Sequence, residues 1–284
     1  MQSDGREVGV VSKRKVYCDI EFISVYKPLR EKIGDRFRDF KIGRSPDDLH
    51  EDRLNPREYD PQSRNFRRRI WYTPENVRPP IQNSLHGSLS FDQDQFGGKN
   101  LYCPSWYGEV GLSDLRFSRE QGVIWPSGNL LSARTLVNKP NQFCSTNSGH
   151  LNSFHSHVIS LLKEFGSVDT FSDQFLETIQ GRNKVMQKYQ FILCSEIDIY
   201  PGYVTKVLLQ AYLAGAVPLY IGDLGNDSNI NRKSFINVLD FPTLRDFTSY
   251  LNTIDDKTYR QIYEQPFLKS LPNVTNIRDL MLGT

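Results

Sequence analysis

The sequence predicts an α/β fold made of two Rossmann-like halves. The strongest sign is residues 189–223, where a short apolar run, a polar loop, a helical stripe and a second apolar run follow one another. A second series of strand and helix patterns begins at residue 142, and short strand patterns lie before residue 105. Strands that alternate with helices are typical of parallel sheets covered by helices on both faces.

The first half is predicted from short strand patterns. Residues 15–22 indicate a first strand, residues 70–73 a second, and residues 88–92 and 100–104 two more. Between the first two, residues 35–69 are charged and lack a clear period, so we expect short helices or a functional flap there. Turn-forming and polar residues fill residues 113–139, which ends this half.

The second half alternates more regularly. Residues 142–146 predict a strand, residues 155–164 a helix, and the region near Val168 a short strand. Within residues 189–223, Thr205 is a plausible N-cap, Gly215 is placed to end the helix, and residues 217–221 form a second buried strand. Helical stripes follow at residues 244–251 and 256–263. We therefore place the domains at residues 1–138 and 139–284.

The loop at residues 195–203 is the first candidate site. A strand, a helix and a further strand in this order form a parallel crossover, whose ligands bind beyond the carboxyl ends of the strands. The loop carries Glu196, Asp198, Tyr200 and Tyr203 and leads into a helix N-terminus. Such a polar, aromatic loop at the start of a helix is suited to a nucleotide or another phosphorylated ligand.

Composition excludes several other functions. The net charge is +2, from 35 basic and 33 acidic residues, so no bulk charge directs the chain to nucleic acid or to a membrane. The 4 cysteines are too scattered for a zinc site, and Cys103, Cys144 and Cys194 are expected to be buried free thiols. The first residues lack the apolar segment of a signal peptide, and no run is long enough to span a membrane.

Four segments, in the same order, resemble motifs of the α-1,3-fucosyltransferases, glycosyltransferase family ten. Residues 68–79, RRIWYTPENVRP, resemble R-I-F-Y-T-G-E-N, and residues 231–241, NRKSFINVLDF, resemble N-x-K-S-F-V-N-V-x-D-F. Residues 263–268, YEQPFL, resemble Y-E-N-P-L. The fourth segment, residues 189–223, resembles F-x-L-C-F-E-N-S, Y-x-T-E-K and V-P-I-Y-W-G. Its matching residues are Phe191, Leu193, Cys194, Glu196, Tyr203, Thr205, Ala211, Tyr212, Val217, Pro218, Tyr220 and Gly222.

The resemblance implies a GT-B fold with its active site in the cleft between two Rossmann-like domains. It implies an inverting transfer of a sugar from a nucleotide sugar to a glycan hydroxyl, with Glu75 as the general base. Asn76 and Arg78 would lie on the acceptor side. Glu196, Asp198, Tyr203 and Thr205 would form the donor site. Helix N–H groups would stabilise the leaving pyrophosphate, so neither a metal nor another cofactor is expected.

The donor segment departs from the family at three positions, the first of which is Ile197, where the family has an asparagine after the glutamate. The family's Glu-Lys pair after the threonine is Lys206-Val207 here, so the usual ribose contact is replaced by a cation. Lys206 remains a candidate for the phosphates, and Arg182 or Lys184 for the arginine that contacts the pyrophosphate in the family. GDP-fucose is the donor that the resemblance implies, and another donor such as UDP-xylose, or lost activity, is compatible with the change.

Two further alternatives stay open. Asp92-Gln93-Asp94 matches in letters the D-x-D triplet that holds Mn²⁺ in another glycosyltransferase class, but it lies in the segment resembling the family's F-D, so we expect no metal. A catalytically inactive glycan-binding relative is the alternative function. The expected location is the cytoplasm, as for bacterial or viral enzymes, unless the chain is a Golgi-type enzyme without its membrane anchor.

Overall fold

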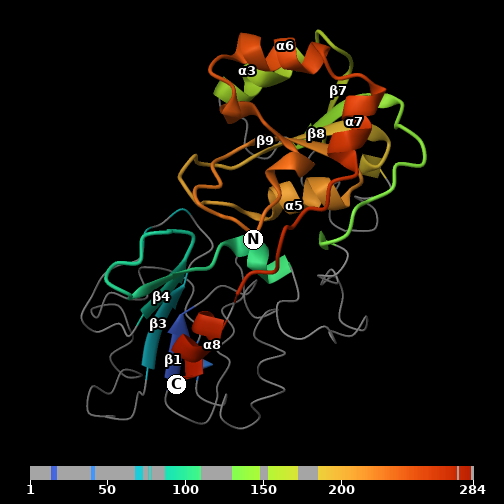
Figure 1. The fold of residues 1–284 in the computed structure, drawn as a ribbon. Helices are drawn as coiled ribbons and strands as arrows, with labels where there is room; N and C mark the ends of the chain where they lie inside the picture. The colour runs from blue at the N-terminus through green and yellow to red at the C-terminus, as the bar shows by residue number, and fades with distance from the viewer. Residues whose placement is uncertain are drawn as a thin grey trace. The chain divides into compact units, whose positions relative to one another are not determined.

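The computed structural model describes residues 14–17, 40–41, 68–72, 76, 78, 87–109, 130–147, 153–171, 185–273 and 275–282. The chain forms two compact units (Figure 1): unit 1 is Met1–Trp125 with Pro272–Thr284, and unit 2 is Pro126–Leu271. The boundary between Trp125 and Pro126 lies before the predicted junction at residue 138, because Leu130 already makes a hydrogen bond within unit 2. Its carbonyl accepts from the Leu268 N–H at 2.9 Å.

Unit 2 holds a parallel sheet whose strand order is β10-β9-β8-β6-β7. Its strands are β6 (Gln142–Asn147), β7 (Val168–Phe171), β8 (Tyr189–Ser195), β9 (Val217–Ile221) and β10 (Ile236–Asn237). All four pairings are parallel. Along the chain the order reverses between β6 and β8, which makes the carboxyl ends of these two strands the topological switch point. The predicted parallel crossover from β8 to β9 is therefore confirmed.

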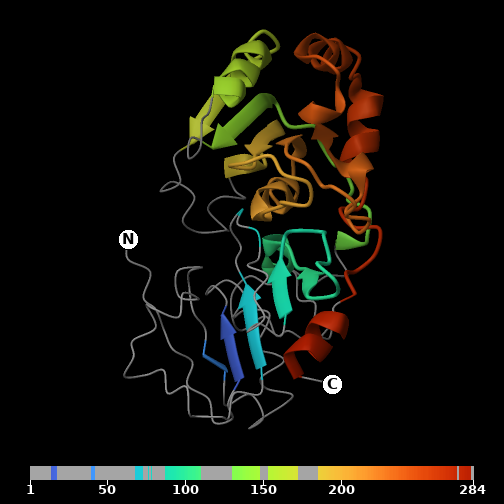
Figure 2. The same ribbon diagram turned by 90° about the vertical axis from the view of Figure 1, so that its left-hand side faces the viewer.

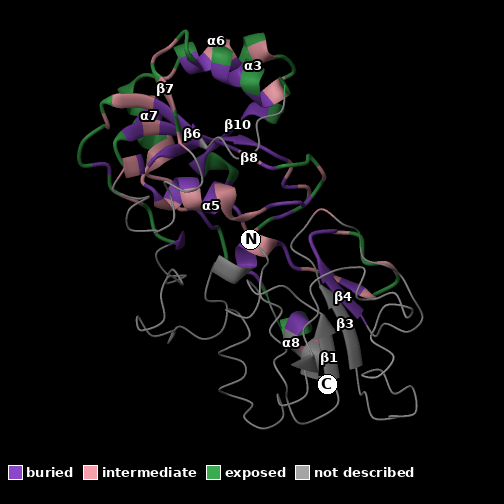
Figure 3. Cartoon of the chain, turned by 180° about the vertical axis from the view of Figure 1, so that it is seen from behind, coloured by how far each residue is buried: buried purple, intermediate pink, exposed green. Residues whose placement is uncertain are grey.

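Helices cover both faces of this sheet. Helices α3 (Ser153–Leu162) and α6 (Leu244–Asn252) contact each other and pack on the face that carries Phe191 and Leu193. Helix α7 (Asp256–Tyr263) adds Tyr259 to the same apolar cluster. Figure 1 shows α5 on the side of the sheet opposite to α3 and α6. Figure 3 shows the strands between them mostly in the colour of buried residues, as a doubly covered sheet requires.

Helix α5 (Lys206–Leu213) begins and ends where the sequence predicts. Thr205 is its N-cap, and the Thr205 hydroxyl accepts from the Val207 N–H. Gly215 has a φ of +83°, a left-handed conformation that favours glycine after a helix end. The Gly215 N–H donates to the carbonyl of Tyr212 at 3.1 Å, which satisfies one of the last carbonyls of the helix.

Arg134 joins three elements of unit 2. Its guanidinium donates to the carbonyls of Tyr212 in α5, Ala216 before β9 and Tyr263 at the end of α7. It also lies 3.7 Å from the ring centre of Tyr212 and 4.0 Å from that of Tyr263. Burial lowers the pKa of Arg134 from its usual value. The backbone dipoles and the two aromatic rings therefore take the place of a carboxylate partner in holding this cation.

Unit 1 holds a second parallel sheet, with strand order β2-β1-β3-β4-β5. Its strands are β1 (Arg14–Tyr17), β2 (Phe40–Lys41), β3 (Arg68–Tyr72), β4 (Gly87–Ser90) and β5 (Asn100–Tyr102). Counted along the chain, the order is the same as in unit 2, and the switch point lies between β1 and β3. Figure 2 shows β1, β3 and β4 running in one direction.

The end of the chain returns to unit 1 as helix α8 (Thr275–Leu282). Leu280 of α8 lies over Gly87 so closely that a Cβ at Gly87 would meet its Cδ1 at 2.6 Å. Ile277 on the same helix is buried, and Leu280 is half-buried. The predicted second domain, residues 139–284, includes α8, because no local pattern shows which sheet a short terminal helix contacts.

Two further expectations concern cysteines and membranes. Cys103, Cys144 and Cys194 are buried free thiols, as predicted, and burial raises the pKa of Cys144 to about 12. Their buried, protonated sulfur atoms act as small apolar groups. In the part of the chain that the structure describes, no helix combines the length and apolar character needed to cross a membrane.

Candidate functional site

The loop after β8 is bound to the end of β9. The Glu196 N–H donates to the carbonyl of Ile221 at 2.9 Å, and the Gly202 N–H donates to the carbonyl of Asp223 at 3.0 Å. Within the loop, the Tyr203 N–H donates to the carbonyl of Tyr200 at 2.9 Å. Gly202, at a φ of +86°, makes the turn that the sequence pair Pro201-Gly202 predicts. The loop therefore leads to α5 along a path set by backbone hydrogen bonds.

Glu196 is the central side chain of this loop. It is 2% exposed, and its Oε1 accepts from the Thr205 N–H at 2.9 Å and from the Tyr220 hydroxyl at 2.8 Å. Its Oε2 is buried and has no hydrogen-bond partner among the described residues. Burial raises the pKa of Glu196 to about 7, although the bonds from Thr205 and Tyr220 act in the opposite direction.

Gly222 makes room for the ring that reaches Glu196. A Cβ at this position would lie 2.4 Å from Cζ of Tyr220. The Gly222 carbonyl in turn accepts from Nδ2 of Asn237 at 3.0 Å, and the Asn237 side chain caps the next turn by accepting from the Leu239 N–H. Glu196, Tyr220, Gly222 and Asn237 thus connect the carboxyl ends of β8, β9 and β10.

The structure gathers some of the predicted donor residues and leaves others apart. Glu196 and Thr205 are joined directly, and Lys206 follows them as the first, half-buried residue of α5. Tyr203 is 5% exposed and belongs to the core, whereas Asp198 is exposed. Arg182 and Lys184 lie outside the described residues. The donor role of each of these residues stays a prediction.

The candidate base lies next to the switch point of unit 1 in the sequence. Glu75 follows the last residue of β3, Tyr72, by three positions, and it lies outside the described residues. Asn76 is half-exposed and Arg78 is exposed. The carboxyl edge of this sheet is where the fold presents ligand-binding loops, which is consistent with a catalytic role for the segment.

Arg78 contacts the loop that follows β4. Its Nε donates to Oδ2 of Asp92 at 2.7 Å, and its guanidinium lies 5.1 Å from the ring centre of Phe96. Asp92 is 3% exposed, while the Arg78 side chain is 53% exposed, so the pair joins a buried carboxylate to a surface cation. The acceptor-side role expected for Arg78 stays a prediction, and the described geometry shows its ion pair with Asp92.

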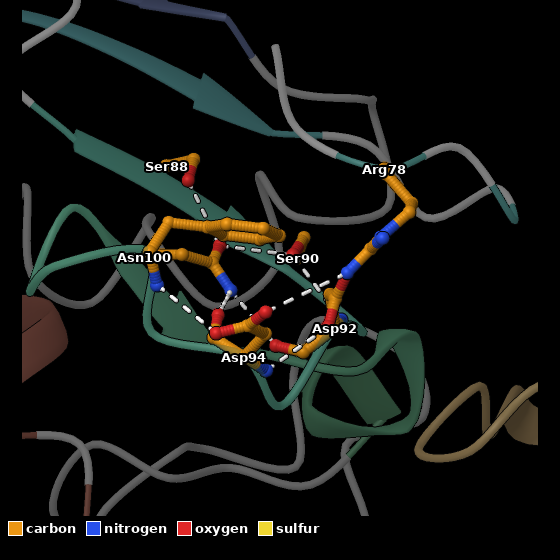
Figure 4. A network of polar contacts seen from close by, with 7 residues as sticks. Arg78, Ser88, Ser90, Asp92, Asp94 and Asn100 are labelled. Carbon is orange, nitrogen blue, oxygen red and sulfur yellow. Dashed lines mark hydrogen bonds and ion pairs between the residues drawn. The ribbon is translucent and has the colours of Figure 1, made fainter. Parts of the chain in front are cut away.

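Asn100 organises the same loop (Figure 4). Its Nδ2 donates to the carbonyls of Asp92 and Asp94 at 2.8 and 2.9 Å, and its Oδ1 accepts from the hydroxyls of Ser88 and Ser90. The Asp94 N–H donates to Oδ1 of Asp92 at 2.9 Å. Both oxygens of Asp92 therefore have internal partners, as expected for a loop-forming residue.

The contacts that join Tyr220, Gly222 and Asn237 to the loop of Glu196 are not among the features that the sequence predicts. Tyr220 lies in an uninterrupted buried strand, where an aromatic residue is expected to be core. Tyr220 and Gly222 match the family motif V-P-I-Y-W-G, and the glycine is the signal of space beside the ring, because a buried tyrosine hydroxyl must find a partner. That signal does not identify Glu196 as the partner.

Comparisons with known proteins agree with this architecture. Residues 139–267 match the family model described as glycosyltransferase family 10 (fucosyltransferase) C-term. The chain is 33% identical over 227 residues to the alpha-(1,3)-fucosyltransferase FucT of Helicobacter pylori, an alignment that covers 70% of this chain and 47% of that protein. It is 28% identical over 216 residues to the human 4-galactosyl-N-acetylglucosaminide 3-alpha-L-fucosyltransferase 9, with 70% and 58% covered. The chain spans about half the length of the curated relatives it matches.

Solved structures show the same fold. The crystal structure of an alpha1,3-fucosyltransferase with GDP-fucose matches with a TM-score of 0.62 and 18% identity, over 100% of this chain and 94% of that chain. The structure of such an enzyme with GDP matches with the same TM-score and 19% identity. The expected GT-B type of fold is thus confirmed. The motifs, the family model and the curated relatives together identify the chain as a member of glycosyltransferase family 10.

Proposed function

We propose that this protein is an inverting glycosyltransferase that moves a sugar from a nucleotide sugar to a hydroxyl of a glycan. The observation that carries the proposal is the loop from β8 into α5, which lies at the switch point of unit 2 and within the residues that match the family model. The N-terminus of α5 carries a partial positive charge, and Lys206 is its first residue. This is a suitable place for a nucleotide diphosphate.

The proposed reaction is a single displacement. The Glu75 carboxylate takes the proton of the acceptor hydroxyl while the hydroxyl oxygen forms a bond to the anomeric carbon. The bond from that carbon to the phosphate oxygen breaks, and the nucleotide diphosphate leaves with the electron pair. The N-terminus of α5 and Lys206 would stabilise the new charge without a metal.

GDP-fucose is the first candidate donor. The matched crystal structures are of alpha1,3-fucosyltransferases with GDP-fucose and with GDP, and the curated relatives are named as fucosyltransferases. The second candidate is a different donor such as UDP-xylose, which Lys206-Val207 favours because a cation cannot accept hydrogen bonds from ribose hydroxyls. The same two residues support the alternative of an inactive glycan-binding relative.

The test measures binding and transfer separately. Calorimetry with GDP and UDP identifies the nucleotide that the protein binds. A transfer assay with GDP-fucose and with UDP-xylose, on glycans ending in a galactosyl-N-acetylglucosamine unit, measures activity. Each transfer assay is repeated in EDTA. We expect diphosphate binding, transfer from one of the two donors and little effect of EDTA.

Three results would contradict parts of the proposal. Binding of glycans without any transfer would support the inactive relative. Loss of transfer in EDTA with recovery in Mn²⁺ would overturn the metal-independent mechanism. Binding of neither GDP nor UDP would overturn the proposal as a whole.

A further inference from the structure

We propose that Glu196 is a positioning residue, which together with Tyr220 fixes the N-terminus of α5 for the donor rather than contacting the donor itself. The inference rests on the proposed function, because it concerns the loop that would hold the nucleotide diphosphate. It assigns to Glu196 a different role from the direct donor contact that its place in the predicted donor site implies.

The first step is the arrangement around Oε1. One oxygen atom accepts from the N-cap residue of α5, Thr205, and from Tyr220 on the neighbouring strand β9. A single carboxylate oxygen therefore links the start of the helix to the sheet. Since Thr205 also caps α5 through its hydroxyl, its backbone has little freedom to rotate.

The second step is the fit of Tyr220. Its ring lies edge-on to Phe235, with ring centres 5.8 Å apart and an angle of 89° between the planes. Gly222 leaves the space in which its Cζ and hydroxyl lie. The hydroxyl is thus held from two sides in the direction of Glu196. The arrangement forms a rigid support, as expected for a residue that sets the geometry of a neighbouring site.

The third step is the exclusion of direct contact. Glu196 is 2% exposed, Oε1 already accepts two hydrogen bonds, and Oε2 is buried as well. Tyr220 is 0% exposed and Thr205 is half-buried, so the cluster lies beneath the loop surface. Lys206 is the next residue after Thr205, and a shift of Thr205 would move the Lys206 backbone with it. Loss of the link should therefore weaken donor binding through the position of α5.

The experiment compares two tyrosine hydroxyls that both bond to the segment around β8. Tyr220→Phe removes the bond to Glu196, just beyond the carboxyl end of the strand. Tyr259→Phe is the matched control, because its hydroxyl donates to the carbonyl of Gln190 at 3.0 Å, near the amino end of β8. Calorimetry gives the Kd for the diphosphate that the wild type binds, and steady-state kinetics give KM for donor and acceptor separately.

We expect Tyr220→Phe to raise the diphosphate Kd and the donor KM by about five- to tenfold, the effect of one buried hydrogen bond, and to leave the acceptor KM unchanged. Tyr259→Phe should lose comparable thermal stability and bind the diphosphate like the wild type. Glu196→Gln keeps an oxygen acceptor for both donors and should stay within about threefold of wild-type affinity, whereas Glu196→Ala should not.

Equal diphosphate binding by the two tyrosine variants would overturn the inference while the proposed function stood. A larger loss in Glu196→Gln than in Tyr220→Phe would also overturn it, because that result requires the carboxylate charge to contact the donor. A wild type that binds no nucleotide diphosphate would overturn the proposed function, and the inference with it.

Discussion

Glu75 is the residue on which proton transfer depends in the proposed mechanism. Glu75→Gln keeps the shape of the side chain and removes its basicity. We expect the rate of transfer to fall by about two to four orders of magnitude, with little change in the Kd of the nucleotide diphosphate. Steady-state transfer assays and calorimetry measure the two quantities. Glu164→Gln, at an exposed position after α3, is the control and should transfer at the wild-type rate.

The raised pKa of Glu196 predicts how the free energy of unfolding depends on pH. Its pKa is about 7 in the folded chain, against 4.5 for an ordinary glutamate, so folding favours the protonated form. The stabilisation of the folded state by the protonated Glu196 carboxyl is complete below pH 4.5 and is lost as the pH rises towards 7. Since one pKa unit is worth about 1.4 kcal/mol, the loss is at most about 3.5 kcal/mol.

The difference between wild type and Glu196→Gln isolates this effect from other titrating groups. Chemical unfolding of both proteins between pH 4 and pH 8 should show the wild type losing stability relative to the variant as the pH rises through this interval. Parallel stability curves would mean that the Glu196 carboxyl has an ordinary pKa in the fold.

At the scale of elements, Arg134 is the junction between α5, β9 and α7. Arg134→Lys keeps the charge and loses the planar donor geometry that serves three carbonyls and two rings. We expect the free energy of unfolding to fall by about 2–4 kcal/mol, since the half-buried cation at this position would lose most of its contacts with carbonyls and rings. Chemical denaturation measures the change.

Arg232→Lys is the control for that experiment. Arg232 donates to one carbonyl, that of Gly225, at an exposed position. Its replacement should change the unfolding free energy by no more than about 0.5 kcal/mol. A similar loss in both variants would show that the stacking and the three carbonyls around Arg134 contribute little.

Local patterns predicted those elements whose signals are themselves local. The strand at residues 217–221 and the helix at 256–263 have the predicted bounds, and Thr205 and Gly215 occupy the predicted cap positions. These features depend on apolar runs and caps within a few residues. The predicted strand at 88–92 ends earlier, at Ser90, because Asp92 and the residues after it form the loop held by Asn100. The predicted strand at 100–104 ends at Tyr102.

The candidate site was predictable where a parallel crossover or a family motif marks it. The loop and the residues Glu196, Thr205 and Lys206 were named from the sequence, whereas the bond between Glu196 and Tyr220 was not. That bond joins residues 24 positions apart across two strands, and its cause is the space above Gly222. Contacts of this kind depend on register and packing, which short sequence patterns do not specify.

At the scale of the whole molecule, the chain crosses between its units twice. It enters unit 2 near Pro126 and returns to unit 1 at Pro272. Helix α8 then packs against β4 in the sheet of unit 1. Unit 2 is thus continuous in sequence, and unit 1 is assembled from both ends of the chain. The stability of unit 1 therefore depends on residues that follow the proposed donor domain.

Ile277→Ala tests this arrangement. Ile277 is 8% exposed in α8, and truncation of a buried isoleucine costs about 2–4 kcal/mol. Hydrogen exchange should become faster in β4 and β5 of unit 1 and stay unchanged in β8 and β9 of unit 2. If unit 2 alone binds the donor, the variant should also keep the wild-type Kd for the nucleotide diphosphate while its rate of transfer falls.

Val158→Ala is the reciprocal control, because Val158 is fully buried in α3 of unit 2. It should accelerate exchange in β6 and β8 and leave β4 unchanged. Faster exchange throughout the chain in both variants would mean that the two units unfold as one cooperative body. In that case donor binding and transfer would be lost together in Ile277→Ala, and the assignment of donor binding to unit 2 would need a variant that acts within that unit.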